Sequence, residues 1–358
     1  MMSDTRRGNR CLWAVLVFLV ACLGLAGGGC STTPALSVEE QMALWEEEGA
    51  VFRTGIMGSG GAFNVGDISY AVSPEGTRIL FTTDSVNIWL LELKSGHVSR
   101  VPVEAGRLWA PLMWSPDGKQ VAAVSFVQEN DGWKRELILL NDEDWSDRKL
   151  TIPLVDFSGP SFSADGKFIF FVRGLKTSAS RVLPGGPYDL YAYDLASGQE
   201  KRLTYGDAYQ MARGYDDGKE IFFSAEWLRW PPSMKPDSDF SDKKLKQGGI
   251  YALNKKSLSL RLLEVDQRDG FFDLLLGGKD QAGNIYFTAS LNRKGRDGGY
   301  TCTVYRCDTN GQHCVRLSRE MYFNGNVKIA SQTGDVFVDD RLGHEIVFRR
   351  LSQSFKEE

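Results

Sequence analysis

A short turn phrase, which recurs six times between residues 73 and 335, constrains the fold more than any other feature of the chain. Each copy leads to a Gly, and a segment rich in Val, Ile and Phe follows. Pro presets φ early in such a turn, and Gly accepts the left-handed backbone at its end. Each copy therefore predicts a tight turn between two antiparallel strands. The copies are Ser73–Arg78, Ser115–Gln120, Ser163–Lys167, Tyr215–Lys219 and the weaker Asp280–Asn284 and Ser331–Asp335.

A second hairpin follows each turn phrase. Asn87–Leu93, for example, turns at Lys94–Gly96, and the returning strands end in similar triplets such as Arg202–Thr204 and Arg316–Ser318. Each repeat thus holds about four strands in roughly 40 to 65 residues, which is the size of a propeller blade. We predict an all-β fold, a six-bladed β-propeller of four-stranded antiparallel blades, over residues 50–358.

These residues resemble the TolB-type, or WD40-like, propeller repeat, whose consensus reads S-P-D-G-K, a strand, Y-x-x-D, G and finally R-L-T. The resemblance covers about Val51 to the C-terminus and is strongest in the first four copies. It implies a propeller that works by binding proteins beside the outer membrane. TolB-type proteins carry an α/β domain before the propeller and are soluble, and this sequence departs from both features. The resemblance therefore implies a mode of action and no particular partner.

The sixth repeat stops early, which raises the question of how the ring closes. Glu345–Arg349 can be its third strand, and only charged residues follow. An open edge invites pairing with other chains. Val51–Thr54 precedes the first blade and is expected to supply the missing outer strand. The alternative is a sixth blade of three strands.

The N-terminus has the order of a bacterial lipoprotein signal peptide. Three Arg residues precede the apolar run Leu12–Leu25, small residues lead into Cys30, and a polar run follows. This order resembles a lipobox, in which the cysteine is diacylated and becomes the first mature residue. Cys30 has the better downstream context and Cys22 the better preceding Leu, so Cys22 stays the alternative; a plain anchor helix is the other reading. We expect a signal peptide over residues 1–29.

Residues 30–49 are expected to form a lipidated tether with a short helix. Ser37 and Glu40 have the spacing of a capping box, and Gly49 is a stop signal, which predicts a helix from about Val38 to Glu48. Several acyl chains would hold the protein at a bilayer. The expected location is therefore the cell envelope, facing the periplasm, on the outer membrane.

Composition sets limits on the partners. The chain has 42 Lys and Arg against 46 Asp and Glu, a net charge of −4. Nucleic-acid binding usually needs a strongly basic domain, so we expect none. No motif for a cofactor or a metal site was found. The expected partners are the membrane, through the lipid, and envelope proteins.

The long insertions share one rim of the predicted propeller. Strand alternation puts the short turns on one rim and all long loops on the other, where binding usually resides. The insertion in the fourth blade contains Trp227, Arg229 and Trp230, and Trp and Arg are enriched at binding hot spots. These three residues are the candidate partner surface. The alternative is that the two Trp side chains fold back over a neighbouring blade.

Catalysis finds little support in the sequence. His97 and His313 fall on the short-turn rim and His344 on the opposite rim, so they are expected to be solvent-facing turn residues. No G-x-S-x-G nucleophile elbow occurs. The Asp residues of the turn phrases are most simply turn formers. We therefore predict no catalytic residue.

Three cysteines lie in the predicted propeller. Cys307 and Cys314 flank one hairpin, and export to an oxidising compartment makes a disulfide between them plausible. Cys302 is an odd number of residues from Cys307, so the two point to opposite faces of one strand. Cys302 is therefore expected to be a buried thiol outside the disulfide.

Two functions remain open at this stage. The first is a non-catalytic protein-interaction or scaffold module of the envelope, and the alternative is an envelope polysaccharide- or peptide-processing propeller enzyme or its accessory subunit. Acidic and basic side chains at the mouth of the central channel would favour the alternative. Small and apolar residues there would favour the first, and the predicted innermost strands are mostly of that kind, with exceptions such as Lys328.

Overall fold

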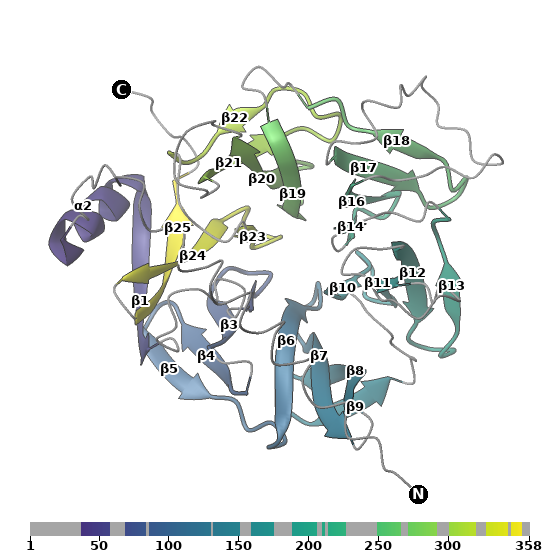
Figure 1. Cartoon of the computed structure of the whole chain (residues 1–358), viewed down its shortest axis with the longest axis horizontal. Coiled ribbons are helices and arrows are strands. Elements are labelled where there is room, and N and C mark those ends of the chain that lie inside the picture. The colour runs from purple at the N-terminus through teal and green to yellow at the C-terminus, as the bar shows by residue number, and fades with distance from the viewer. Residues whose placement is uncertain are drawn as a thin grey trace, which may run out of the picture.

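The computed structural model describes residues 37–57, 69–83, 86–129, 132–150, 159–174, 188–205, 210–211, 214–226, 249–265, 271–291, 301–319, 327–342 and 345–352. The described strands form six antiparallel sheets arranged around a central axis (Figure 1). The predicted all-β six-bladed propeller is confirmed. The expected signal peptide over residues 1–29, the tether up to residue 36, Cys22 and Cys30 lie outside the described residues.

Five blades use four successive positions from the axis outward. Blade 1 is β2 (Tyr70–Val72), β3 (Arg78–Thr82), β4 (Ile88–Glu92) and β5 (His97–Arg100); blade 2 is β6 (Arg107–Trp114), β7 (Gln120–Glu129), β8 (Gly132–Asn141) and β9 (Asp147–Leu150); blade 3 is β10 (Ser161–Phe162), β11 (Phe168–Gly174), β12 (Tyr188–Asp194) and β13 (Glu200–Arg202). Blade 5 is β19 (Phe271–Lys279), β20 (Ile285–Leu291), β21 (Thr301–Cys307) and β22 (Val315–Arg316), and blade 6 is β23 (Val327–Ile329), β24 (Val336–Leu342), β25 (Glu345–Leu351) and β1 (Gly49–Met57).

Blade 4 departs from the four-strand expectation at its inner edge. Its innermost position is divided between β14 (Gln210–Met211) and β15 (Tyr215–Asp216), which both pair with β16 (Glu220–Glu226). The outer strands are β17 (Gly249–Asn254) and β18 (Leu260–Leu262). The division changes which side chains reach the axis, as described below.

The first strand of the propeller closes the last blade. β1 pairs antiparallel with β25, with Gly49 opposite Leu351 and Arg53 opposite Val347. The hydroxyl of Thr54 donates to the carbonyl of Ile346 at 2.7 Å, inside the blade. The predicted closure by Val51–Thr54 is confirmed, and the three-stranded alternative is wrong. Pairing of the two chain ends removes an open sheet edge from the ring.

The predicted short helix is present as α2 (Val38–Glu48) and lies on the outside of blade 6 (Figure 1). Its capping box forms as expected, because the Ser37 hydroxyl accepts from the Glu40 N–H and the Glu40 carboxylate accepts from the Ser37 N–H. Trp45 is buried against Val347, and the guanidinium of Arg349 lies 4.8 Å from the centroid of its ring. Tertiary contact therefore holds a helix that is short for independent stability in water.

Hydrogen bonds within the turn phrase explain its residue types. The Ser115 hydroxyl accepts from the N–H of Gln120 at 2.9 Å and donates to the Asp117 carboxylate at 2.6 Å. That carboxylate also accepts from the N–H of Lys119, while Gly118 takes a φ of 70°. The third copy repeats this arrangement. The Asp residues of these two copies are turn formers, as predicted.

The terminal triplet of a blade anchors the outer strand to the strand inside it. In blade 3 the Thr204 hydroxyl accepts from the N–H of Leu190 at 2.9 Å and donates to the buried carboxylate of Asp189 at 2.7 Å. Arg202 forms an ion pair with Asp189 and donates to the carbonyl of Thr204. Blade 5 repeats the bond from Arg and the bond to the hydroxyl. The recurring Arg-Leu-Thr motif is thus a clasp at the blade edge.

The core consists of apolar layers between neighbouring blades. One buried cluster joins blades 3 and 4, another joins blades 4 and 5, and a third joins blades 1 and 2. Leu258 packs against the first of these and Trp145 against the third. Both have a φ of 57° at the turn position where Gly96 occurs in blade 1. Their packing compensates the cost of a left-handed backbone, which is about 1–2 kcal/mol.

Candidate functional site at the mouth of the central channel

A cavity of about 360 Å³ occupies one end of the central channel, and every blade contributes to its lining. Many of these residues belong to the turns between the first and second strands, so the cavity opens on the short-turn rim. One lining residue from each blade in turn is Pro74, Pro116, Ala164, Tyr215, Lys279 and Ser331. A pocket of this size can take a small ligand or a few residues of a peptide.

Two glycines bring blades 5 and 6 close together at the cavity wall. A Cβ at Gly277 would lie 1.9 Å from Cγ1 of Val327, and one at Gly278 would lie 2.8 Å from Cγ1 of Ile329. Real Cβ atoms essentially never come within 3.0 Å of such neighbours. β19 and β23 can therefore approach each other only because these positions have no side chain.

The shortened turn of blade 4 brings polar groups to the axis. The Asp217 N–H donates to the carbonyl of Glu220, so the hairpin turns through Gly218 and Lys219 alone. Other phrases, such as Ser115–Gln120, span two residues more. Tyr215 therefore lies on the inner strand, and its side chain lines the cavity.

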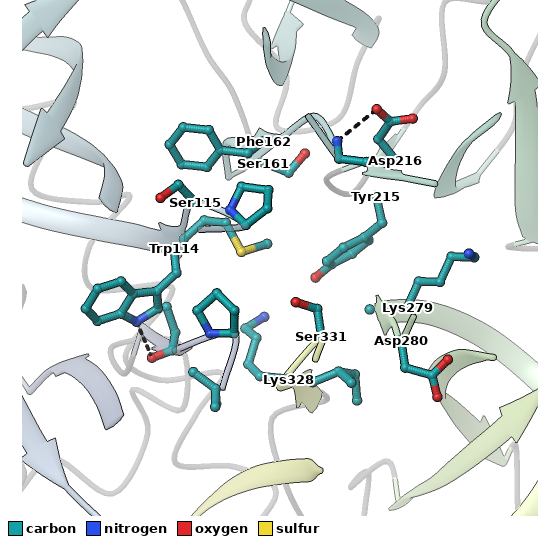
Figure 2. Close-up of a pocket in the computed structure, with 18 of the residues that line it drawn as sticks. Trp114, Ser115, Ser161, Phe162, Tyr215, Asp216, Lys279, Asp280, Lys328 and Ser331 are labelled. Carbon is teal, nitrogen blue, oxygen red and sulfur yellow. Dashed lines mark hydrogen bonds between the residues drawn. The ribbon is translucent and has the colours of Figure 1, made fainter. Parts of the chain in front are cut away.

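Asp216 connects blade 4 with blade 3. Its fully buried side chain accepts from the N–H of Ala164 at 3.0 Å, across the blade boundary (Figure 2), and from the N–H of Gly218 at 2.9 Å. The ammonium of Lys255 donates to the same carboxylate at 2.7 Å. Three donors thus hold a carboxylate that would otherwise be costly to bury.

Asp217 is also engaged by donors of the protein. Its carboxylate accepts from the N–H groups of Lys219 at 2.8 Å and Glu220 at 2.7 Å, and the Lys279 ammonium lies 3.6 Å away. Burial alone would raise the pKa of Asp217, but these N–H groups and Lys279 hold the pKa below its ordinary value. Asp217 is therefore ionised at neutral pH.

Asp280 replaces the Ser of the turn phrase in blade 5. Its carboxylate accepts from the N–H and the side-chain amide of Asn284, each at 2.8 Å, and from the hydroxyl of Tyr286 at 2.8 Å. Burial, together with this bond to a carboxylate, raises the pKa of Tyr286. The hydroxyl therefore stays protonated and remains a donor to Asp280.

The centre of the cavity is surrounded by donors rather than carboxylates. Figure 2 shows the Lys328 ammonium and the hydroxyls of Tyr215 and Ser331 pointing into the centre, while the carboxylates of Asp216 and Asp280 point away from it. Lys328 is only 7% exposed, and its Nζ lies 5.7 Å from the centroid of the Tyr70 ring. Apolar walls complete the lining, among them Met113, Phe162 and Ile329.

Histidines do not take part in this cavity. His97 begins β5 and is exposed; His313 is exposed in the turn between β21 and β22, where its Nδ1 lies 2.9 Å from Oδ2 of Asp308. Both are solvent-facing turn residues, as predicted, and His344 lies outside the described residues. Within the described part of the chain, no three His, Cys, Asp or Glu side chains are grouped so that they could hold a metal ion.

The remaining predicted sites have different outcomes. Trp227, Arg229 and Trp230 lie outside the described residues, so the proposed partner surface on the long-loop rim stays a prediction. The structure joins Cys307 and Cys314 by a disulfide, and Cys302 is buried outside it. In the part of the chain that the structure describes, no helix is both long and apolar enough to cross a bilayer.

The channel mouth meets parts of both sequence criteria. It contains acidic and basic side chains, which would favour an enzyme, and small and apolar ones, which would favour binding. Sequence reasoning directed attention to the long-loop rim and missed this cavity. The available signals were the Tyr215-Asp216 pair in place of Ser-Pro and the lysine at position 328 in an otherwise apolar inner strand.

Fold and mouth together define a six-bladed propeller of the TolB-like, WD40-like type. The structure of putative TolB from Agrobacterium tumefaciens superposes with a TM-score of 0.55 at 18% identity, over 80% of this chain and 90% of that one. TolB from Acinetobacter baumannii gives a TM-score of 0.53 at 15% identity, over 80% of this chain and 63% of that one. At these identities the likeness establishes the fold alone.

One curated protein is similar in sequence. The "Uncharacterized peptidase YuxL" of Bacillus subtilis (strain 168) is 28% identical over 211 residues, which are 48% of this chain. The match covers only 31% of that relative's length. No protein-family model matches the chain.

Proposed function

We propose that this chain is a non-catalytic β-propeller, anchored in the outer membrane through a lipid on Cys30 and facing the periplasm, which binds envelope proteins at the mouth of its central channel. The observation that carries the proposal is the state of the three acidic side chains in the mouth. Asp216, Asp217 and Asp280 each accept at least two close hydrogen bonds from the protein's own donors. A general base must instead direct a lone pair at its substrate.

The shape of the mouth supports binding of a protruding segment. Six blades enclose a cavity about 360 Å³ in volume that opens on the short-turn rim, and its wall combines apolar side chains with hydroxyl and ammonium donors. Specific sites commonly combine an apolar wall with a few placed polar groups. Short turns packed on rigid strands also leave little to reorganise when a partner enters, which lowers the cost of binding.

The decisive experiment compares the same substitution at two places on one rim. Ala164 is an exposed residue of the mouth, whereas Ala196 is an exposed residue of a turn on the same rim outside it. The lipidated protein and its Ala164→Trp and Ala196→Trp variants would each be used to capture partners from the native envelope. We expect Ala164→Trp to lose the partner and Ala196→Trp to retain it.

A third variant tests the opposite rim. Deletion of residues 227–248 removes Trp227, Arg229 and Trp230 from the long-loop rim. Loss of the partner on this deletion, with retention by Ala164→Trp, would contradict binding at the mouth and support the surface that the sequence suggested. Membrane fractionation of Cys30→Ser and Cys22→Ser variants tests the anchor, and we expect only the first to release the protein.

The sequence match to a named peptidase favours a second candidate, in which the propeller serves a peptide-processing enzyme as its accessory subunit. The chain spans 31% of that relative, so any hydrolase would reside in a separate polypeptide or region. Hydrolysis of labelled peptides by the purified chain, with and without envelope extract, tests this candidate. Peptide cleavage by the purified chain alone would contradict the non-catalytic proposal.

A further inference from the structure

Three hydrogen-bond donors converge on the centre of the channel mouth from opposite sides. Lys328 lies on β23 and Ser331 follows that strand in blade 6, whereas Tyr215 reaches in from β15 of blade 4 (Figure 2). The ammonium belongs to a side chain that is 93% buried by exposure of the whole residue (7% exposed). A charge held in such surroundings interacts with an opposite charge much more strongly than one in water.

The acidic groups of the lining do not fill this centre. Asp216 is directed to blade 3 and bonded to Lys255, Asp217 is bonded to its own turn beside Lys279, and Asp280 is bonded to Asn284 and Tyr286. Figure 2 shows the Asp216 and Asp280 carboxylates turned outward. The groups that face the centre thus offer hydrogen bonds and one positive charge.

The number and kind of these donors select the ligand. An ammonium and two hydroxyls match a group with one negative charge and two acceptor oxygens, and a hydrogen bond from a charged donor is about twice as strong as a neutral one. A phosphate dianion would bring a second charge into a wall that already contains three carboxylates. A cation would be repelled by Lys328.

We propose that the mouth of the channel binds a carboxylate group, which Lys328, Tyr215 and Ser331 hold at its centre. The volume of about 360 Å³ corresponds to roughly a dozen water molecules at about 30 Å³ each. It therefore has room for a carboxylate together with the adjoining one or two residues of a peptide against Met113 and Ile329. This inference rests on the proposed function and names the chemistry by which a partner would be recognised.

The test uses short peptides that differ only in charge at one end. N-acetyl-trialanine with a free carboxylate, its C-terminal amide, and succinate would be titrated into the full chain by calorimetry. We expect the free acid to bind at least tenfold more tightly than the amide. Equal binding of the acid and the amide, or binding of neither, would overturn the inference. Succinate binding as tightly as the peptide would support the carboxylate and identify a free small acid as its source.

Variants assign the donors. Lys328→Met retains the apolar stem and should weaken binding of the acid at least tenfold, and Tyr215→Phe and Ser331→Ala should each weaken it about three- to tenfold. The matched control is Lys219→Met, which removes the same charge from an exposed turn of the same rim. Wild-type affinity in Lys328→Met would contradict the assignment. Thermal unfolding of each variant establishes that it is folded at the temperature of the titration.

Failure here can be distinguished from failure of the proposed function. If Ala164→Trp abolishes partner capture while the acid and the amide bind alike, the mouth binds a protein through other chemistry. If Ala164→Trp leaves capture unchanged, the function assigned to the mouth is wrong whatever the peptides do.

Discussion

Arg53 and Glu345 connect the first strand of the propeller with the last, and the Nε of Arg53 donates to Oε2 of Glu345 at 2.9 Å. The second oxygen of the same carboxylate accepts from the N–H of Gly55 at 2.8 Å. The two ends of the propeller are thus joined by side chains as well as by the β1–β25 ladder. In a ring of blades, this junction is the place where opening would expose a strand edge.

The junction should weaken in acid. Burial would raise the pKa of Glu345, but Arg53 and the Gly55 N–H hold it below the ordinary value of 4.5. Stability from this carboxylate is therefore present above about pH 4.5 and lost as pH falls through its lower folded-state pKa. At pH 7 Glu345→Gln should cost about 1–2 kcal/mol, and the difference from the wild type should shrink below pH 4. Urea unfolding at a series of pH values measures this, with exposed Glu46→Gln as the control. A difference that is constant between pH 7 and pH 3 would contradict it.

Removal of the disulfide should destabilise blade 5. Cys307 and Cys314 are seven residues apart, and the loop-entropy model gives about 2–3 kcal/mol for a loop this short. We expect a Cys307→Ser/Cys314→Ser variant to lose that amount in denaturant unfolding under non-reducing conditions. Titration of thiols in the unfolded, unreduced protein should find Cys302 alone reactive beyond residue 36. Three reactive thiols there would rule the bridge out.

Leu258 should reverse the usual order of Gly and Ala. Both Leu258→Gly and Leu258→Ala lose packing against the cluster between blades 3 and 4, but only Gly relieves the left-handed φ of 57°. Leu258→Gly should therefore be more stable than Leu258→Ala by about 1 kcal/mol. Gly96→Ala is the matched change, since Gly96 has a φ of 69° with open space at its Cβ, and it should cost a similar amount. An Ala variant at 258 more stable than the Gly variant would show that backbone strain there is small.

Gly277→Ala should disturb the contact between blades 5 and 6. Its Cβ would overlap Cγ1 of Val327 at 1.9 Å and approach the Val327 carbonyl at 2.8 Å. Overpacking in such a site typically costs about 1–3 kcal/mol. Val327→Ala in the same chain should restore part of the loss, because the side-chain overlap disappears and the carbonyl contact remains. Additive effects of the two changes in thermal unfolding would contradict a direct clash.

Much of the fold was predictable because its signals are local. Ser115 and Gly118 specify a turn through their own backbone neighbours, and Ser37 with Glu40 specifies the start of α2 within a single turn of helix. The repeat of such signals implied blades, and six blades implied a ring. Even the closing strand followed, since a sixth repeat that ends early leaves one place vacant beside it.

The candidate site was not predictable in the same way. Lys328 and Tyr215 are more than one hundred residues apart, and nothing near either residue in the chain indicates that they face each other. The sequence also drew attention to the long loops, because length and Trp content are visible in a sequence whereas a cavity is not. The shortened turn at Asp217 was visible, but its effect on the axis depends on where blade 4 stands.

The sequence by itself thus determined the elements of this protein: the turns, the strands, their grouping into blades and the helix ahead of them. It could do so because each depends on hydrogen bonds and backbone conformations within a few residues. Only the tertiary structure decided which side chains meet at the axis, which carboxylates are engaged by donors from another blade, and that a lysine and two hydroxyls face one cavity. Those relationships arise when six blades close around a centre, and no single repeat encodes that geometry.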